Sequence, residues 1–152
     1  MIYLDNAATT RVYDCAIDAA TEIMKNEFFN PNTTYKSGVS AREKIEVSRK
    51  KIADIIGART DELVFTSCAT EANNWVFNCG IKRRKGNIVI TAGEHASVYE
   101  PAMQLKNKGW DIRIAPLTSQ GTVDQTALLN LVDDDNALVS IIHVSNETGA
   151  VN

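Results

Sequence analysis

The sequence has no surplus of basic charge, no long apolar run and no paired set of cysteines. Its 16 Lys and Arg are outnumbered by 19 Asp and Glu, for a formal net charge of −3. A dedicated nucleic-acid-binding protein needs a basic surplus to neutralise phosphates, so we expect no nucleic-acid partner. The longest apolar runs, such as residues 137–142, are too short to span a bilayer, so we expect no membrane segment.

Cysteine is scarce, and the three that occur form no recognisable pattern. An odd number does not make a disulfide framework, and no CxxC pair or His/Cys cluster has the spacing of a zinc site. We therefore predict no metal site, and we expect Cys15 and Cys79, each inside a predicted helix, to be buried. The first residues lack a basic leader and a cleavage signal, so we expect a cytoplasmic protein.

What is present is a globular composition with alternating helix and strand patterns. The 152 residues, 44% hydrophobic and 23% charged, are enough for one domain with a core. Hydrophobic periodicity predicts helices at residues 13–27, 40–56, 69–84, 97–108 and 124–132, and strands at residues 62–66, 87–91, 111–115 and 137–144. This order predicts an α/β fold of three layers, α/β/α, with a mostly parallel sheet.

Two helix ends carry specific signals. Ser40 is predicted to cap the helix at residues 40–56, with Glu43 as its capping-box partner, and Gly57 is predicted to end it. Asp124 is predicted to cap the last helix. The basic run at residues 82–85 falls in the last turn of a predicted helix, where cations complement the helix dipole, so we interpret it as structural.

Polar residues follow three of the predicted strands at their carboxyl ends, where open α/β sheets bind ligands. The first group, residues 66–71, has small and hydroxyl side chains at the start of a helix, which suits a phosphate. The alternative is an ordinary N-cap provided by Ser67 or Thr70. On residue types alone, both interpretations stay open.

The other two groups contain a histidine and an asparagine. His95, within residues 93–97, could stack on a flat ring or move a proton near neutral pH, or it could be a structural histidine. Asn146, within residues 143–149, offers both a donor and an acceptor, or it could be part of a polar turn. All three groups are predicted to lie at one edge of one sheet.

Several motifs, in this order and spacing, make the chain similar to a known family. They are Tyr3-Leu4-Asp5-Asn6-Ala7-Ala8-Thr9-Thr10, Asn30-Pro31 with Gly38, Val64-Phe65-Thr66-Ser67-Cys68-Ala69-Thr70-Glu71, Glu94-His95, and His143-Val144-Ser145-Asn146-Glu147-Thr148-Gly149. With these motifs the sequence resembles the NifS/IscS cysteine desulfurases, which are class V aminotransferase-type enzymes dependent on pyridoxal 5'-phosphate. The resemblance covers essentially the whole chain.

The resemblance implies a role for each candidate residue. Ala69 and Thr70 would bind the phosphate of pyridoxal phosphate, His95 would stack on the pyridine ring and assist proton transfer, and Asn146 would bond near the cofactor's phenolic oxygen and the substrate carboxylate. Enzymes of this family convert L-cysteine to L-alanine and an enzyme persulfide, and the sulfur goes to iron–sulfur clusters and other thio-cofactors. The resemblance also implies the large domain of the type I aminotransferase fold.

The sequence departs from this family in length and in one motif. Family members run to roughly 400 residues, so the chain resembles an N-terminal portion, with residues 1–12 normally packed on a small domain and residues 13–152 a partial cofactor-binding domain. The Schiff-base lysine and the persulfide cysteine lie beyond the region of resemblance, so we predict that this chain alone is inactive. Cys68 stands where the family has glycine, and a thiol adds bulk beside the phosphate.

The missing strand partner of residues 62–66 would leave open sheet edges, so we expect a homodimer or other self-association. Alternatives remain. The chain could be a non-catalytic assembly module, or one half of a split enzyme that pairs with a C-terminal chain, a scaffold or a sulfur acceptor. It could also be part of another class V enzyme, such as a selenocysteine lyase.

Overall fold

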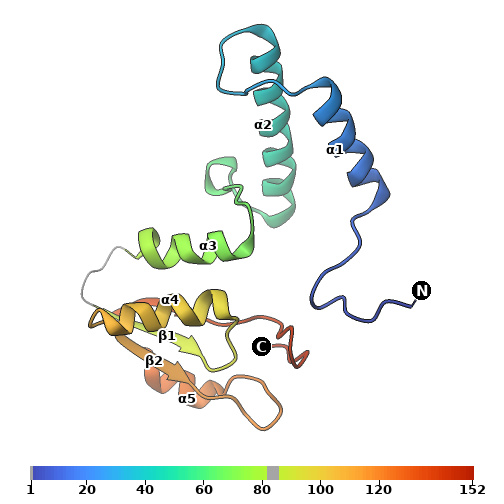
Figure 1. Ribbon diagram of the computed structural model, residues 1–152. Helices are drawn as coiled ribbons and strands as arrows, with labels where there is room; N and C mark the ends of the chain where they lie inside the picture. Colours follow the sequence, from blue (N-terminus) through green and yellow to red (C-terminus); the bar gives the residue numbers. More distant parts are fainter. Residues whose placement is uncertain (1, 82–85) are drawn as a thin grey trace. The chain divides into compact units, whose positions relative to one another are not determined.

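The computed structural model describes residues 2–81 and 86–152 (Figure 1). The chain divides into two compact units, Met1–Phe65 and Thr66–Asn152, which we describe separately. The predicted helix at residues 69–84 and the basic run at residues 82–85 fall partly or wholly on positions outside the described residues.

The first unit is helical and buries little. It contains α1 (Asp14–Asn26), α2 (Lys36–Ile56) and the short 3-10 helix η1 (Thr60–Glu62). Within these helices only two residues are buried, both on α2: Gly38 and Ala53. Large apolar side chains such as Ile23, Ile45 and Ile52 are exposed in this chain. The unit therefore has apolar helix faces without a core of its own.

The helix α2 starts four residues before the predicted cap. Its N-cap is Tyr35, so the prediction that Ser40 caps this helix with Glu43 is wrong, and Ser40 lies inside the helix. Residues 36–39 are already helical, and the backbone N–H of Val39 donates to the Tyr35 carbonyl at 3.1 Å. A full turn of helix therefore precedes Ser40. The predicted end is confirmed, since Gly57 adopts the left-handed conformation with φ of 70° that ends many helices.

Residues 62–66 do not form the predicted strand. Glu62 ends η1, and Leu63 has extended angles (φ −101°, ψ 127°) but no strand pairs with this segment. A strand needs a hydrogen-bonded neighbour, and the described part of the chain offers none here. The side chain of Arg49 binds the segment instead, donating from Nη1 to the Leu63 carbonyl at 2.7 Å.

The second unit contains a parallel three-stranded sheet. Its strands are β1 (Asn87–Thr91), β2 (Asp111–Ala115) and β3 (Asn136–Ser140), in the spatial order β2-β1-β3. The predicted strands at residues 87–91 and 111–115 are confirmed. β3 is shorter than the predicted 137–144, because beyond Ser140 the chain leaves the sheet and Val144 pairs with Val151 in an isolated antiparallel bridge.

Helices cover both faces of this sheet. α4 (Ala96–Asn107) and the π-helical turn η2 (Val76–Gly80) cover one face, and α5 (Gln125–Leu131), capped by Asp124 as predicted, covers the other. α3 (Ala69–Trp75) runs directly into η2 and packs against α4. Figure 1 shows α4 and α5 on opposite sides of the strands. The unit is a three-layer α/β/α arrangement, as predicted.

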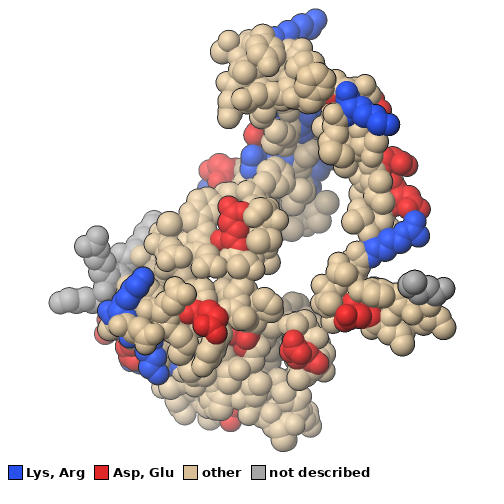
Figure 2. Space-filling view, in the orientation of Figure 1, with Lys and Arg blue, Asp and Glu red and all other residues tan. Residues whose placement is uncertain are grey.

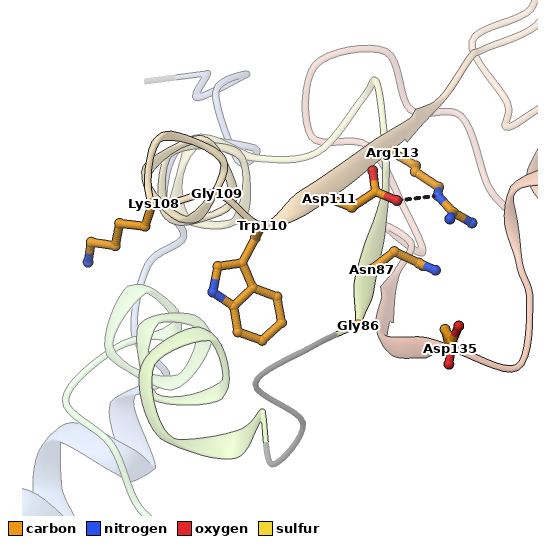
Figure 3. A pocket seen from close by; sticks show the side chains of 8 residues that line it. All are labelled: Gly86, Asn87, Lys108, Gly109, Trp110, Asp111, Arg113 and Asp135. Carbon is orange, nitrogen blue, oxygen red and sulfur yellow. Dashed lines mark hydrogen bonds and ion pairs between the residues drawn. The ribbon is translucent and has the colours of Figure 1, made fainter.

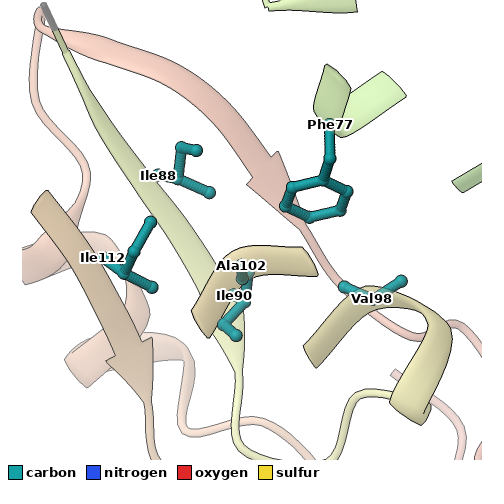
Figure 4. Packing of buried hydrophobic residues seen from close by; sticks show 6 residues of the cluster. All are labelled: Phe77, Ile88, Ile90, Val98, Ala102 and Ile112. Atoms are coloured by element: carbon teal, nitrogen blue, oxygen red, sulfur yellow. The ribbon is translucent and has the colours of Figure 1, made fainter. Parts of the chain in front are cut away.

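The alternation of side chains along β1 produces two cores. All five residues of this central strand are buried. Ile88 and Ile90 point to the face covered by η2 and α4, where they pack with Phe77, Val98, Ala102 and Ile112 (Figure 4). Val89 points to the other face and packs with Ala115, Val123 and Leu128. A strand with branched apolar residues on both faces is typical of a parallel sheet between helices.

Surface features differ from expectation in one respect. Cys15, Cys68 and Cys79 are all exposed, so the prediction that Cys15 and Cys79 are buried is wrong.

On the face drawn in Figure 2, acidic and basic side chains are interspersed and no large patch carries one sign among the described residues. None of the described helices combines the length and apolar character needed to cross a membrane.

Candidate functional site

A cavity of about 340 Å³ in the second unit brings together two of the residues singled out from the sequence, Thr70 and His95. Thr70 lies in the first turn of α3, and His95 is the residue immediately before α4. The residues that line the cavity come from α3, from α4 and from the residue just before α4: Thr70, Asn74, His95, Ala96, Ser97, Glu100, Pro101 and Gln104. Two of the three polar groups predicted from the sequence therefore meet at one cavity. The prediction that the group at Thr70 follows a strand is wrong, because residues 62–66 form none.

The start of α3 is held by hydrogen bonds within its own loop. Glu71 accepts from both the backbone N–H and the hydroxyl of Ser67, each at 2.6 Å. Cys68, not Ser67 or Thr70, is the N-cap residue, and its side chain makes no cap hydrogen bond. Cys68 has φ of −165° and ψ of 169°, extended angles open to any residue. Replacing glycine by cysteine at this position therefore causes no backbone strain.

Hydrogen-bond donors at this helix start stabilise negative charge. Hydrogen bonds from the Ser67 hydroxyl, and then from its backbone N–H, lower the pKa of Glu71. The backbone N–H of Glu71 and the hydroxyl of Ser67 lower the pKa of the Cys68 thiol, with smaller contributions from Thr70. Both shifts have the same physical origin, because N–H and O–H donors at a helix start stabilise negative charge. The Ser67 donors are already bound by the Glu71 carboxylate, so a phosphate here would use the other N–H groups of the helix start.

Ser97 holds the ring of His95 through hydrogen bonds at Nδ1. The backbone N–H of Ser97 donates to Nδ1 of His95 at 3.1 Å, and the Ser97 hydroxyl lies 2.8 Å from the same nitrogen. Asn73 on α3 donates from Nδ2 to the Ser97 hydroxyl oxygen at 2.9 Å. Ser97 is buried, while His95 lines the cavity. The histidine ring is thus held by both helices of the site.

The remaining two candidates lie outside the lining of this cavity. Ala69 is the first residue of α3, next to Thr70, and does not line it. Asn146 is exposed, and its Nδ2 donates to Glu147 at 3.1 Å. Its loop is shaped by Ser145, whose hydroxyl accepts from the backbone N–H groups of Glu147 and Thr148.

Residue-type reasoning missed Asn73, Asn74 and Ser97. Asn74 lies four residues after Thr70, which places both on the same face of α3, and this spacing was the sequence signal that could have identified Asn74.

Two other hollows have different characters. One, of about 520 Å³, lies at the amino ends of β1 and β2, the opposite end of the sheet from His95 (Figure 3). Its Arg113 is already paired with Asp111 at 2.9 Å and with Asp133 at 2.6 Å. The other, of about 510 Å³, lies in the first unit between α1 and α2 and includes Phe29 and Phe65. Ligand sites of open α/β sheets lie at the carboxyl ends, which favours the cavity at His95.

Residues 2–152 match the family described as Aminotransferase class-V. Among curated proteins, the NifS/IcsS protein homolog of Lactobacillus delbrueckii subsp. bulgaricus is 38% identical over 154 residues, which is 99% of this chain and 40% of that protein. Cysteine desulfurase IscS of Methanosarcina thermophila is 36% identical over 154 residues, covering 99% of this chain and 38% of that protein. This chain belongs to the class V aminotransferase family.

Solved structures agree with this assignment. A protein titled NIFS-LIKE PROTEIN is 37% identical, superposes with a TM-score of 0.93, and is matched over 99% of this chain and 42% of its own. The structure titled SspA in complex with cysteine is 28% identical, with a TM-score of 0.91, and is matched over 99% of this chain and 44% of its own. Within the family, therefore, the chain is similar to NifS/IscS-like cysteine desulfurases, and it spans about 40% of their length.

The residues of the cavity fit one part of a pyridoxal phosphate site. The donors at the start of α3 suit the phosphate, and an imidazole at the same cavity suits a flat ring. No lysine is among the residues that line the described cavity. The chemistry of this donor set fits the phosphate and ring of the cofactor, without a residue to hold it covalently.

Proposed function

We propose that this chain is the N-terminal portion of a pyridoxal-phosphate-dependent cysteine desulfurase and supplies the phosphate-binding and ring-stacking side of the active site. The observation that carries the proposal is the meeting of Thr70 and His95 at one cavity of the second unit. Similarity to cysteine desulfurases over 99% of the chain supports it. The cofactor would supply electron withdrawal from the substrate carbon, which no side chain supplies at neutral pH.

Each residue has a task that its surroundings support. The hydroxyl and backbone N–H of Thr70, with the N–H of Ala69, would bind the phosphate at the positive end of α3. His95, held by Ser97, would stack on the ring and hold or move a proton. Asn146 would bond near the phenolic oxygen of the cofactor and the substrate carboxylate. Binding, orientation and proton transfer would thus come from this portion.

The remaining parts of the site would lie in the region that the relatives have and that this chain does not span. Relatives are matched over 38–40% of their length. We propose that a lysine for covalent attachment of the cofactor and a cysteine that carries the persulfide lie there, and that residues 1–12 pack on a small domain and residues 13–152 belong to the cofactor-binding domain. The chain alone would then be inactive.

The proposed reaction is the conversion of L-cysteine to L-alanine with transfer of sulfur to the enzyme, for iron–sulfur cluster assembly in the cytoplasm. One solved relative is titled as a complex with cysteine, which supports this substrate class over a selenocysteine lyase. We also propose that the protein self-associates as a homodimer, since both β2 and β3 have an open edge in the described sheet. An assembly module without catalysis remains the second candidate, favoured by the absence of a lysine from the described cavity lining.

Titration with pyridoxal phosphate tests the proposal. Binding is measured by isothermal titration calorimetry on the wild type, on Thr70→Ala, and on Thr126→Ala, which changes an exposed threonine on α5 as a matched control. We expect Thr70→Ala to weaken binding about tenfold or more, because a hydrogen bond to a charged group contributes roughly 1.5–3 kcal/mol. Equal affinities for the two variants would contradict the proposed phosphate site.

A further inference from the structure

Three polar groups from two helices form a chain of hydrogen bonds that ends on the imidazole of His95. Asn73 on α3 donates to Ser97 Oγ at 2.9 Å, and Ser97 Oγ lies 2.8 Å from His95 Nδ1. The backbone N–H of Ser97 points to the same Nδ1 at 3.1 Å. Asn73 and Ser97 are 24 residues apart in the sequence, so the chain depends on the packing of α3 against α4.

The direction of each proton in this chain follows from the one donor that cannot reverse. A backbone N–H always donates, so Nδ1 of His95 must carry a lone pair. The Ser97 hydroxyl therefore points its own proton at Nδ1. Its oxygen must then accept, and the Asn73 amide supplies the N–H that it accepts. No hydroxyl rotor or amide orientation remains free once the backbone N–H is placed.

We propose that Asn73 and Ser97 are positioning residues that select the tautomer of the uncharged His95 ring with its proton on Nε2. Nδ1 is occupied by Ser97, and no described residue hydrogen-bonds to Nε2, so Nε2 is the ring nitrogen that remains for a ligand. A ligand at this cavity then meets an N–H donor from His95. Such a donor favours acceptors, such as a carboxylate or a phenolate oxygen.

The chemical consequence rests on the proposed function, whereas the tautomer itself does not. If the cavity binds pyridoxal phosphate and an amino acid, His95 would enter the reaction as a hydrogen-bond donor and would have to release the Nε2 proton before acting as a base there. If the cavity binds something else, the same tautomer is still present. A measurement of the ring nitrogens therefore tests this inference separately from cofactor binding.

The test is long-range ¹H–¹⁵N NMR of the histidine side chains in the 152-residue chain, recorded where the imidazoles are uncharged. The sequence has two histidines, His95 and His143, so the spectrum is simple and His143 is an internal reference. We expect wild-type His95 to show a protonated Nε2 and an unprotonated Nδ1. A protonated Nδ1 in the wild type would overturn the proposal.

The decisive variant is Asn73→Asp. A carboxylate cannot donate to Ser97 and would instead accept its hydroxyl proton, so Ser97 Oγ would turn a lone pair towards Nδ1. The Ser97 backbone N–H still points to Nδ1 and opposes this change, so we expect a partial rise in the population with a protonated Nδ1. Asn74→Asp is the matched control, since it makes the same charge change at the next residue on the same cavity, where the Asn74 amide bonds to the Thr70 carbonyl and not to Ser97.

Ser97→Ala supplies a second, milder variant. It removes the hydroxyl and keeps the backbone N–H to Nδ1, so we expect a smaller shift of the His95 tautomer in the same direction. Retained dispersion of the Ile88 and Ile90 methyl signals shows that each variant is folded, because both side chains are fully buried beside α4. If Asn73→Asp does not fold, Ser97→Ala decides. An unchanged His95 spectrum in every folded variant would overturn the proposal.

Discussion

Asn87 and Asp133, which are 46 residues apart, are joined by a hydrogen bond from the Asn87 amide to the Asp133 carboxylate at 2.8 Å. Asn87 is 3% exposed and also accepts from the Asn136 amide. Arg113 of the edge strand β2 donates to the other oxygen of Asp133, which precedes β3, at 2.6 Å. Together these hydrogen bonds connect the amino end of the central strand β1 to both neighbouring strands, at the end of the sheet away from His95.

The first prediction concerns the pH dependence of this link. Hydrogen bonding by Arg113, and then by Asn87, lowers the pKa of Asp133 below its usual value. A carboxyl group with a lower pKa in the folded state stabilises the fold above its unfolded pKa, and this stabilisation is lost as the pH falls through its folded pKa. We expect Asp133→Asn to lower the thermal unfolding midpoint at pH 7, and to lower it less in acid.

Circular dichroism melts from pH 7 down to pH 3 measure this difference. Asp18→Asn, which neutralises an exposed aspartate on α1, is the control for a general charge effect. A difference between wild type and Asp133→Asn that stays constant across the pH range would show that the ionised carboxylate contributes nothing there.

The second prediction concerns the three exposed thiols. Donors at the start of α3, first the Glu71 backbone N–H and then the Ser67 hydroxyl, lower the pKa of Cys68. Because the thiolate is the nucleophile, we expect iodoacetamide to alkylate Cys68 faster than Cys15 and Cys79 at neutral pH. Ser67→Ala should slow the reaction at Cys68 alone. Peptide mass spectrometry over time measures all three rates in one sample, and equal rates would contradict the prediction.

The third prediction concerns Gly38, near the start of α2. A Cβ atom here would lie 1.9 Å from Thr33 Oγ1 and 2.7 Å from the Asn30 carbonyl oxygen, which also accepts the Thr33 hydroxyl at 2.7 Å. We expect Gly38→Ala to destabilise the first unit by about 1–3 kcal/mol, the usual range for overpacking. Hydrogen exchange of residues 30–45 reports the loss.

Gly80→Ala provides the comparison for that substitution. A Cβ there meets nothing closer than 3.8 Å, so the same chemical change carries no clash. If Gly38→Ala leaves the exchange rates of residues 30–45 as slow as Gly80→Ala does, the close approach of α2 to the Asn30 turn is not present in solution.

The fourth prediction is that the isolated chain does not turn over L-cysteine. With pyridoxal phosphate and a reductant present, we expect no L-alanine above the level given by free cofactor, because no lysine lines the described cavity at Thr70 and His95. Borohydride reduction followed by peptide mass spectrometry should find no single preferred lysine. Multiple turnovers, or stoichiometric labelling of one lysine, would contradict this prediction.

Parts of the structure that depend on local pattern were predictable, and parts that depend on distant partners were not. The strand at residues 87–91 was predicted correctly because Ile88, Val89 and Ile90 are branched residues on both faces of a central strand. The segment 62–66 also has three consecutive apolar residues but lacks a neighbouring strand, and it stays unpaired. Sequence periodicity contains no information on whether a neighbour exists.

The site shows the same division. Thr70 and His95 could be found because each lies just after a predicted strand, and the structure brings them to one cavity although only the strand before His95 forms. Asn73 and Ser97 could not, because their importance arises from a side-chain contact between two helices 24 residues apart. An asparagine or serine near a helix start has many ordinary uses, and residue type alone does not distinguish them.

The central claim is that the cavity at Thr70 and His95 binds pyridoxal phosphate. Chemical-shift mapping tests it most directly, with the ¹⁵N-labelled 152-residue chain titrated with pyridoxal phosphate and, separately, with inorganic phosphate and with pyridoxal. We predict that pyridoxal phosphate shifts the backbone signals of Thr70, Glu71 and Ser97 and the ring signals of His95. Shifts confined to the hollow at Lys108 and Trp110, or no shifts at millimolar cofactor, would contradict it.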